Sequence, residues 1–178
     1  PNAVPEVVAG FIWISMLAGG ERAVLSRIVM AFGLSPQDWL NSFPLTMIIV
    51  VNTWRGIATA MILLTAGLSS VPQEVKEAAV MDGASPSQIF RMITLPLILP
   101  TIFLYMLVST VATISIFGFV YALTRGGPGG ATEILGIYIY NQSFTAYQLG
   151  YGAAVAVVSL AVSLVIGGIY VRALKVEV

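Results

Sequence analysis

The chain has 178 residues, of which 58% are hydrophobic and only 9% are charged, and its formal net charge is zero. A soluble domain carries about 25% charged residues, so this chain cannot coat a water-facing surface. Zero net charge argues against a nucleic-acid partner, and the absence of cysteine from the sequence excludes disulfides and thiolate metal sites. The composition predicts an all-α, polytopic membrane protein.

Four apolar runs predict the membrane spans, because a helix needs about 20 mostly apolar residues to cross a bilayer. The runs do not alternate in polarity, which favours helices over barrel strands. In chain order, they cover residues 4–18, 43–68, 97–123 and 149–171. The first run is short, and the chain opens without Met or a basic signal-peptide region, so we expect further sequence upstream.

Two connections, residues 19–42 and 124–148, lie on one side of these spans, and their sequences predict different structures. Residues 19–42 predict a short helix in the membrane interface, with apolar residues Val24, Leu25, Ile28 and Phe32 opposite charged residues Glu21, Arg22 and Arg27. Residues 124–148 begin with the turn "TRGGPGGATE". An aromatic set typical of a membrane–water boundary follows, formed by Tyr138, Tyr140, Phe144, Tyr147 and Tyr151.

Charge placement gives the orientation. Two spans separate residues 69–95 from the C-terminal tail, so both lie on the same side. That side carries the basic residues Lys76, Arg91, Arg172 and Lys175, and the opposite side carries Arg22, Arg27 and Arg125. The small excess of basic residues favours a cytoplasmic polar segment and tail.

One polar segment stands out between the second and third spans. It holds Glu74, Lys76, Glu77, Asp82 and Arg91, five of the sixteen charges in the sequence. Ser70 and Gln73 predict a capping box for a helix over residues 70–83, with Pro72 in its first turn and Gly83 as its stop. Ser85, Pro86 and Gln88 predict the capped start of a second helix.

The first of these helices has a shallow face, because Val75, Ala78, Ala79 and Asp82 recur at helical spacing. Such a face suits the groove of another protein. The alternative is an amphipathic hairpin that lies in the membrane interface. A plain connector would need only a few residues.

A longer pattern runs through this segment: E-A-A, three residues, G, nine residues, then I-x-L-P. Its positions are Glu77, Ala78, Ala79, Gly83, Ile93, Leu95 and Pro96. The pattern resembles the loop of membrane permease subunits of bacterial ATP-binding-cassette (ABC) importers. Two further stretches resemble the maltose-type carbohydrate branch of that family: "WLNSFPLTMIIVVNTWRGIATAMILLTAGLSSVPQEVKEAA" and "YALTRGGPGGATEILGIYIYNQSFTAYQLGYGAA".

The resemblance implies a helix bundle of the type I importer kind, one transmembrane domain over residues 1–178. Family members usually have six spans, so four would form the C-terminal part of a subunit. Residues 69–96 would form a cytoplasmic coupling loop that contacts a separate ATPase dimer through Glu77, Ala78, Ala79, Asp82, Gly83, Ile93, Leu95 and Pro96. The further implied partners are a second permease subunit, an extracytoplasmic solute-binding protein and a sugar, at the plasma or inner membrane.

Polar residues within the spans are candidates for the path of the solute. Asn52, Arg55, Gly56 and Thr59 form one helical stripe on the second span, and Arg55 would be costly there without a polar partner. Ser109 and Thr113, with Phe117 one turn further, form a second set on the third span. Amides, hydroxyls and an aromatic ring suit a sugar. Arg55 would also suit a glycerol phosphate ester, or pair with a carboxylate in the missing N-terminal region, and the hydroxyls could bond their own helix.

Other functions fit less well. The glycine-rich turn "RGGPGGAT" lacks the Lys of an ATP-binding P-loop. An intramembrane enzyme would need a base, but the sequence has no His, and no Lys lies within a span. A secondary transporter would favour broken helices or an internal repeat, and neither is evident in the sequence. We expect no metal and no cofactor.

Overall fold

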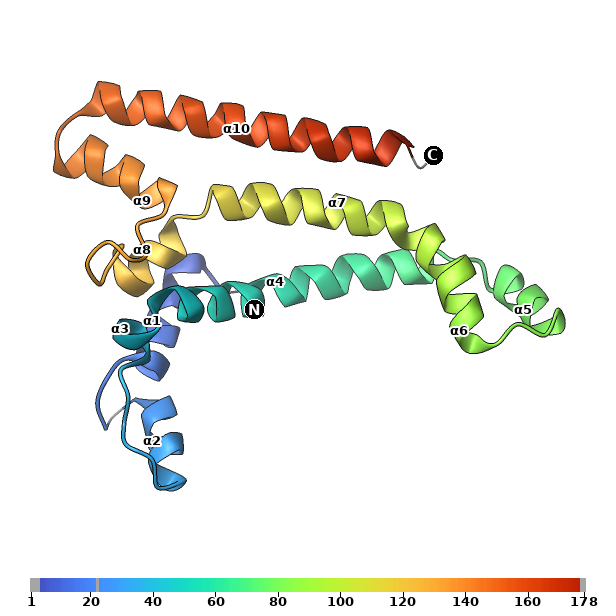
Figure 1. The fold of residues 1–178 in the computed structure, drawn as a ribbon, viewed down its shortest axis with the longest axis horizontal. Coiled ribbons are helices and arrows are strands. Elements are labelled where there is room, and N and C mark those ends of the chain that lie inside the picture. Colours follow the sequence, from blue (N-terminus) through green and yellow to red (C-terminus); the bar gives the residue numbers. More distant parts are fainter. Residues whose placement is uncertain (1–3, 22, 177–178) are drawn as a thin grey trace. The chain divides into compact units, whose positions relative to one another are not determined.

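The structure, a computed structural model, describes residues 4–21 and 23–176, and within this part every regular element is helical (Figure 1). The elements are α1 (Glu6–Leu17), α2 (Val24–Ala31), α3 (Trp39–Ser42), α4 (Pro44–Ser69), α5 (Gln73–Met81), α6 (Pro86–Ile89), the π-helical turn η1 (Phe90–Thr94), α7 (Leu95–Ile114), α8 (Gly118–Thr124), α9 (Leu135–Tyr140), the π-helical turn η2 (Asn141–Thr145) and α10 (Leu149–Val176).

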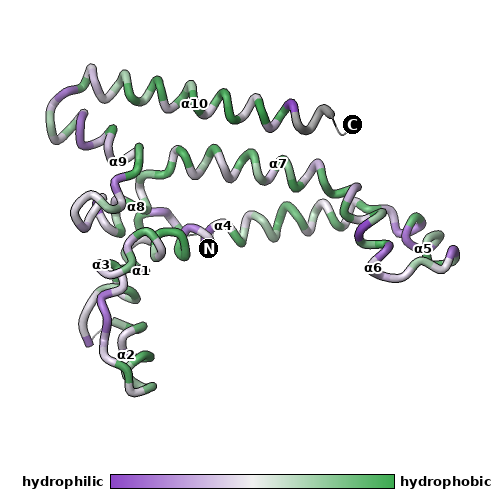
Figure 2. The backbone as a smooth tube through the Cα atoms, in the orientation of Figure 1, coloured by the Kyte–Doolittle hydropathy of each residue, from purple (hydrophilic) through white to green (hydrophobic). Residues whose placement is uncertain are grey.

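Three helical stretches within the described residues are long and apolar enough to cross a membrane: Pro44–Ser69, Pro86–Ile114 and Leu149–Arg172. Figure 2 shows hydrophobic residues predominating along α4, α7 and α10, with polar residues gathered in α5 and α6. The second and fourth predicted spans, residues 43–68 and 149–171, agree with these stretches to within one residue at each end.

The first and third predicted spans need correction. α1 has 12 residues and covers only about 18 Å at 1.5 Å per residue, less than a hydrocarbon core of about 30 Å. The third span ends at Ile114, not at residue 123, because the backbone leaves helical geometry at Phe117 (φ −140°, ψ −63°) and restarts as α8. Apolar residues lie on both sides of this break, so hydropathy alone does not detect it.

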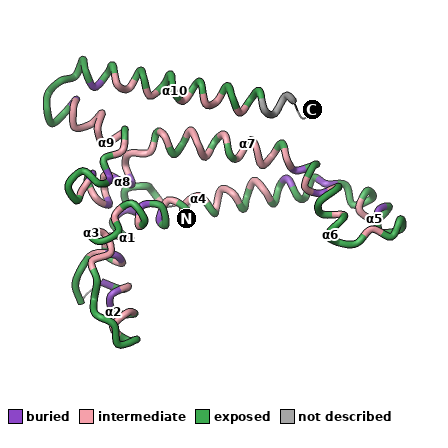
Figure 3. The backbone as a smooth tube through the Cα atoms, viewed as in Figure 1, coloured by how far each residue is buried: buried purple, intermediate pink, exposed green. Residues whose placement is uncertain are grey.

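The described chain forms two compact units. The first comprises Pro1–Arg55 and Ala112–Ser163, and the second comprises Gly56–Val111 and Leu164–Val178. Buried side chains of the first unit form one hydrophobic cluster, made of Leu17, Ile48, Val51, Phe119, Val120, Leu123 and Ile137. Burying each of these side chains stabilises the fold by about 1.5–3 kcal/mol. α8 therefore anchors this unit, and Figure 3 shows buried residues along it.

Helix α1 packs directly on α8. Gly10 makes this contact possible, because a Cβ at that position would lie 2.7 Å from the Cβ of Ala122. On its other side, α1 meets α4 through Trp13 and Trp54, whose rings are edge to face with centroids 5.5 Å apart. Small residues and aromatic rings thus fix the position of the short helix.

Within the second unit, α4 and α7 approach closely and run antiparallel. A Cβ at Gly67 would lie 3.1 Å from the hydroxyl of Thr101, and the phenol of Tyr105 donates a hydrogen bond of 3.2 Å to the carbonyl of Gly56. Close approach at a small residue is typical of helices that pack in lipid. Among the described residues, none in the most apolar window of α10 is buried within the chain.

The predicted interface helix forms as α2, and its apolar side chains divide into two sets. Val24, Ile28 and Phe32 are 46%, 51% and 80% exposed, as expected for an outward apolar face. Leu25 instead packs against the hydrophobic cluster, so placing it on that face was wrong. Arg22 lies outside the described residues.

The start of α10 gives a packing test. A Cβ at Gly152 would overlap the hydroxyl of the buried Ser143, whereas a Cβ at Gly150 would meet nothing within 4 Å. We predict that Gly152→Val destabilises the subunit by about 1–3 kcal/mol through overpacking. Gly150→Val, in the same helix, is the control. Thermal unfolding in detergent measures both, and equal melting temperatures would contradict the packing.

Candidate functional site

The polar segment turns sharply between α5 and α6. Gly83 adopts φ +81°, a left-handed conformation that favours glycine. Its N–H donates 3.0 Å to the carbonyl of Val80, and the N–H of Ala84 donates 2.9 Å to that of Ala79, so the turn satisfies the end of α5. A side chain at Gly83 would meet nothing within 4 Å, which means that only the backbone requires glycine here.

The start of α6 has the predicted capping box. The Ser85 hydroxyl accepts a hydrogen bond from the Gln88 N–H, and the Gln88 side chain accepts one of 2.8 Å from the Ser85 N–H, with Pro86 in the first turn. The cap predicted at Ser70 was wrong. Its hydroxyl donates 2.8 Å back to the carbonyl of Gly67, and α5 begins only at Gln73 without a side-chain cap.

A π-helical turn joins this segment to the span. In η1 the N–H of Leu95 donates to the carbonyl of Phe90, five residues back. The next residue, Pro96, has no N–H, and its ring would clash with a carbonyl four residues back in a regular helix. The wide turn accommodates the proline, so Pro86–Ile114 continues as one helical stretch. Ile93 and Leu95 are half-buried within it.

The segment exposes apolar side chains as well as charges. Glu77 and Ala78 are exposed, and Glu77 accepts a 3.2 Å hydrogen bond from the side chain of Gln73. Ala79 is only 8% exposed, so its predicted place on an outward face was wrong. The exposed apolar side chains are Val75, Val80, Met81, Phe90 and Met92, with Met81 at 88% and Met92 at 74%.

In the first unit, Arg55 has a partner within the chain. Its guanidinium donates 2.7 Å to a carboxylate oxygen of Glu6, and it lies 5.3 Å from the ring centroid of the fully buried Phe119. The pair answers the question of how α4 carries a charge. Reasoning from the sequence did not single out Glu6, although it is an isolated acid at the start of an apolar helix.

The remaining candidates on α4 differ in their surroundings. Asn52 lies one turn before Arg55 and is half-buried, and among the described residues its amide has no hydrogen-bond partner. In the second unit, Gly56 offers its carbonyl to Tyr105, and Thr59 is half-buried. The four residues of the stripe thus lie on one helix, α4, at the predicted spacing, but each has a different environment.

The structure does not bring Ser109, Thr113 and Phe117, the second group of candidates, together on one helix. The hydroxyl of Ser109 donates 3.1 Å to the carbonyl of Met106, its own helix, and Thr113 is exposed. Phe117 lies beyond the end of α7, so its expected place one turn further along the same helix was wrong. Its ring instead packs on Tyr121 and Tyr140, with centroids 5.2 Å and 5.3 Å away.

Phe117 belongs to an aromatic cluster of the first unit, formed with Tyr121, Tyr140 and Phe144. A hydrogen bond with Tyr121 raises the pKa of the Tyr140 phenol above its ordinary value. A second contact joins Tyr138 and Tyr151 at 3.2 Å between hydroxyls, and this hydrogen bond raises the pKa of Tyr138. The predicted aromatic set is mostly engaged in contacts between rings.

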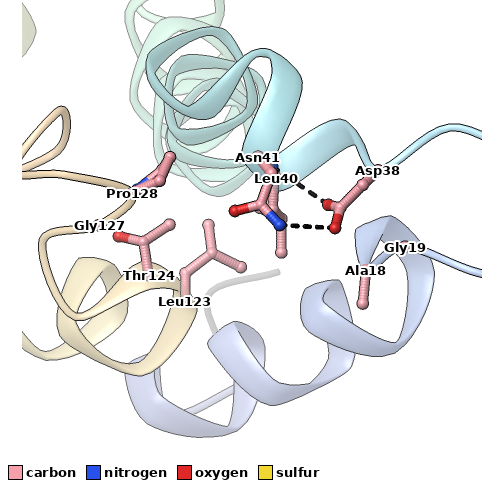
Figure 4. A pocket seen from close by; sticks show the side chains of 9 residues that line it. All are labelled: Ala18, Gly19, Asp38, Leu40, Asn41, Leu123, Thr124, Gly127 and Pro128. Carbon is pink, nitrogen blue, oxygen red and sulfur yellow. Dashed lines mark hydrogen bonds between the residues drawn. The ribbon is translucent and has the colours of Figure 1, made fainter.

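A pocket of about 330 Å³ opens in the first unit between the end of α1, α3 and the turn after α8 (Figure 4). Asp38 and Asn41 line it, and the Asp38 carboxylate accepts from the Asn41 N–H (3.1 Å) and amide (2.6 Å). Figure 4 shows Thr124 and Pro128 on the opposite wall. These hydrogen bonds cap α3 and occupy both oxygens of the one acid in the pocket.

Three long apolar helical stretches within the described residues are those of a polytopic membrane protein. Residues 1–174 match the family of binding-protein-dependent transport system inner membrane components, and the chain belongs to this family. The recognition made from the Glu77–Pro96 pattern is confirmed.

The curated relatives that match the chain are named as permease proteins of transport systems. The chain is 30% identical over 175 residues to the trehalose/maltose transport system permease protein MalF of Thermococcus litoralis, covering 97% of the chain and 58% of the relative. It is 34% identical to the sn-glycerol-3-phosphate transport system permease protein UgpA of Agrobacterium fabrum (91% and 56% covered). It is 32% identical to the arabinooligosaccharides transport system permease protein AraP of Bacillus subtilis (93% and 54% covered). The chain thus spans a little over half the length of these relatives.

Solved structures show the same fold. The chain is similar to a chain of a bacterial ABC transporter for alginate, crystallised with an alginate pentasaccharide-bound periplasmic protein. The TM-score is 0.78 at 20% identity, with 96% of this chain and 60% of that chain covered. A second crystal structure of a bacterial ABC transporter, involved in alginate import, gives a TM-score of 0.79 at 20% identity, covering 98% and 62%. The helix-bundle class predicted from the sequence is thereby confirmed.

The Ser85 cap gives a local test. We predict that Ser85→Ala destabilises the start of α6 by about 1 kcal/mol, because the Gln88 N–H loses its acceptor. Amide exchange at residues 87–90 should accelerate by about fivefold. Ser87→Ala is the control, since this exposed serine lies in the same turn and makes no side-chain hydrogen bond among the described residues. Equal exchange in both variants would contradict the cap.

Proposed function

We propose that this chain is a permease subunit of an ATP-driven, solute-binding-protein-dependent importer, and that it forms part of the path of a sugar. The observation that carries the proposal is the polar segment, where a seven-position pattern coincides with two short helices, a left-handed glycine turn and exposed apolar side chains. The two short helices, with the tight Gly83 turn between them and the Ser85 cap at the start of α6, form a defined element between two long helices, as docking requires.

The segment supports contact with a separate protein. Met81 and Met92 are mostly exposed, and methionine is common at surfaces that dock partners because its side chain is flexible and polarizable. Glu77 and Asp82 are also exposed and supply charge beside them. We assign residues 69–96 as a coupling loop within a single transmembrane domain, and the partner as the ATPase dimer of the importer.

ATP hydrolysis is assigned to that partner. The sequence lacks the Gly-Lys-Ser/Thr of a P-loop, and relatives that match this chain are named permease proteins. A second permease subunit and an extracytoplasmic solute-binding protein complete the proposed importer, in keeping with the family's description as binding-protein-dependent.

The solute is proposed to be a sugar, as for the relatives named for trehalose/maltose and arabinooligosaccharides. The free amide of Asn52 supports a path beside α4, since amides bind hydroxyls well. A glycerol phosphate ester is the second candidate, favoured by the 34% identity to a glycerol-phosphate permease and by the presence of Arg55.

The coupling assignment predicts the effect of Gly83→Leu. A side chain at φ +81° costs about 1–2 kcal/mol in backbone strain or shifts the turn, and about 1.4 kcal/mol would lower association with the ATPase subunit about tenfold. Gly33→Leu is a matched control, because Gly33 has φ +78° and equally open surroundings. Co-purification of the ATPase subunit measures the effect. Equal loss in both variants would show general misfolding, and normal recovery with Gly83→Leu would contradict the assignment.

The topology gives a further prediction. Ser87 lies at the very start of the second long helical stretch, Pro86–Ile114, and Gly129 lies after its end, so they should face the cytoplasm and the outside, respectively. Single-cysteine variants Ser87→Cys and Gly129→Cys can be labelled in intact cells with a membrane-impermeant thiol reagent. We expect labelling of Gly129→Cys only, with Ser87→Cys labelled after permeabilisation. The reverse result would invert the orientation.

A further inference from the structure

The charge of Arg55 is cancelled inside the chain. Glu6 approaches to 2.7 Å, and the side chains of Arg55 and Glu6 are 21% and 50% exposed. The fully buried ring of Phe119 lies beside the guanidinium. An anion that came to bind Arg55 would therefore have to displace Glu6 or lie beside its negative charge.

Glu6 also keeps an acceptor that the pair does not use. Its second carboxylate oxygen lies 3.2 Å from the place a Cβ on Gly118 would occupy, so glycine leaves room for it. Among the described residues, this oxygen has no hydrogen-bond donor. A carboxylate accepts hydroxyl hydrogen bonds strongly, and the unpartnered amide of Asn52 belongs to the same unit.

We propose that Glu6 is a specificity-determining residue: it neutralises Arg55 and offers an acceptor, so the site takes neutral polyhydroxy solutes and disfavours phosphate or sulfonate esters. This inference rests on the proposed function, because it places the pair beside the solute. It decides between the two solute classes that the relatives leave open. Arg55 acts here by holding the carboxylate in place.

Val7 offers a position from which to measure the local charge. It is 47% exposed, and its methyl Cγ2 and the second oxygen of Glu6 lie within about 7 Å of each other, since both approach the same point beside Gly118. In the full-length permease, purified in nanodiscs and free of other reactive cysteines, Val7→Cys is labelled with anionic or cationic methanethiosulfonates. The readout is the ratio of the two reaction rates.

We expect Glu6→Gln to raise the anion-to-cation rate ratio by about tenfold, because a unit charge at this distance changes encounter by several-fold for each reagent. Arg55→Gln should lower the ratio, and the double variant should return it close to that of the unaltered pair. Glu21→Gln is the control, because Glu21 lies beyond the far end of the 12-residue α1. An unchanged ratio in Glu6→Gln, or no labelling by either reagent, would overturn the proposal.

The solute class is tested with the same variant and the neutral thiol reagent methyl methanethiosulfonate. Maltose should slow labelling of Val7→Cys with the pair intact, and sn-glycerol 3-phosphate should do so only after Glu6→Gln. Equal protection by glycerol phosphate with the pair intact would overturn the inference while leaving the importer assignment standing. If neither solute protects Val7→Cys while the charge ratios are as expected, the solute does not bind beside the Glu6–Arg55 pair, and the inference is wrong. ATP-dependent sugar uptake by the whole importer tests the function separately.

Discussion

In the hydrocarbon core of a bilayer, every backbone N–H and C=O must find its partner within the chain, and the described architecture depends on this constraint. α4 and α10 meet it as uninterrupted helices of 26 and 28 residues. The remaining long stretch, Pro86–Ile114, has two prolines beyond its first turn, Pro96 and Pro100, which cannot donate a hydrogen bond, and the π-helical turn lies directly before Leu95 and Pro96. Irregular backbone is otherwise concentrated between the long helices, where backbone hydrogen bonds in turns and caps supply partners.

The same constraint applies more strongly to charge. Arg55 sits within an apolar helix, and its pairing with Glu6 fixes the start of α1, a helix too short to be held by membrane insertion alone. Phe119 links that pair to the hydrophobic cluster. Electrostatics and packing therefore converge on α1, α4 and α8 in the first unit, whereas the second unit holds its polar segment by caps and turns.

Features set by neighbours in the sequence could be predicted, and those set by distant contacts could not. The Ser85 capping box and the Gly83 turn depend on a few adjacent residues, and both were found correctly. Ser70 met the same local rule but bonds backward, because α4 continues to Ser69 and its last carbonyls compete for the hydroxyl. The end of α7 and the partner of Arg55 were missed. Each depends on packing between segments far apart in the sequence, which hydropathy and spacing do not record.

The approach of α1 to α8 has a consequence for how this sequence can change. Gly10 and Ala122 share a space that holds one methyl group but not two, since a second Cβ would stand 2.7 Å from the first. A methyl gained at position 10 therefore has to be offset by one lost at position 122. The exchange is not symmetric for the helices, because glycine would weaken the seven-residue α8 by about 1 kcal/mol while alanine would strengthen α1. Substitutions at these two positions should be inherited together, with one order of events more accessible than the other.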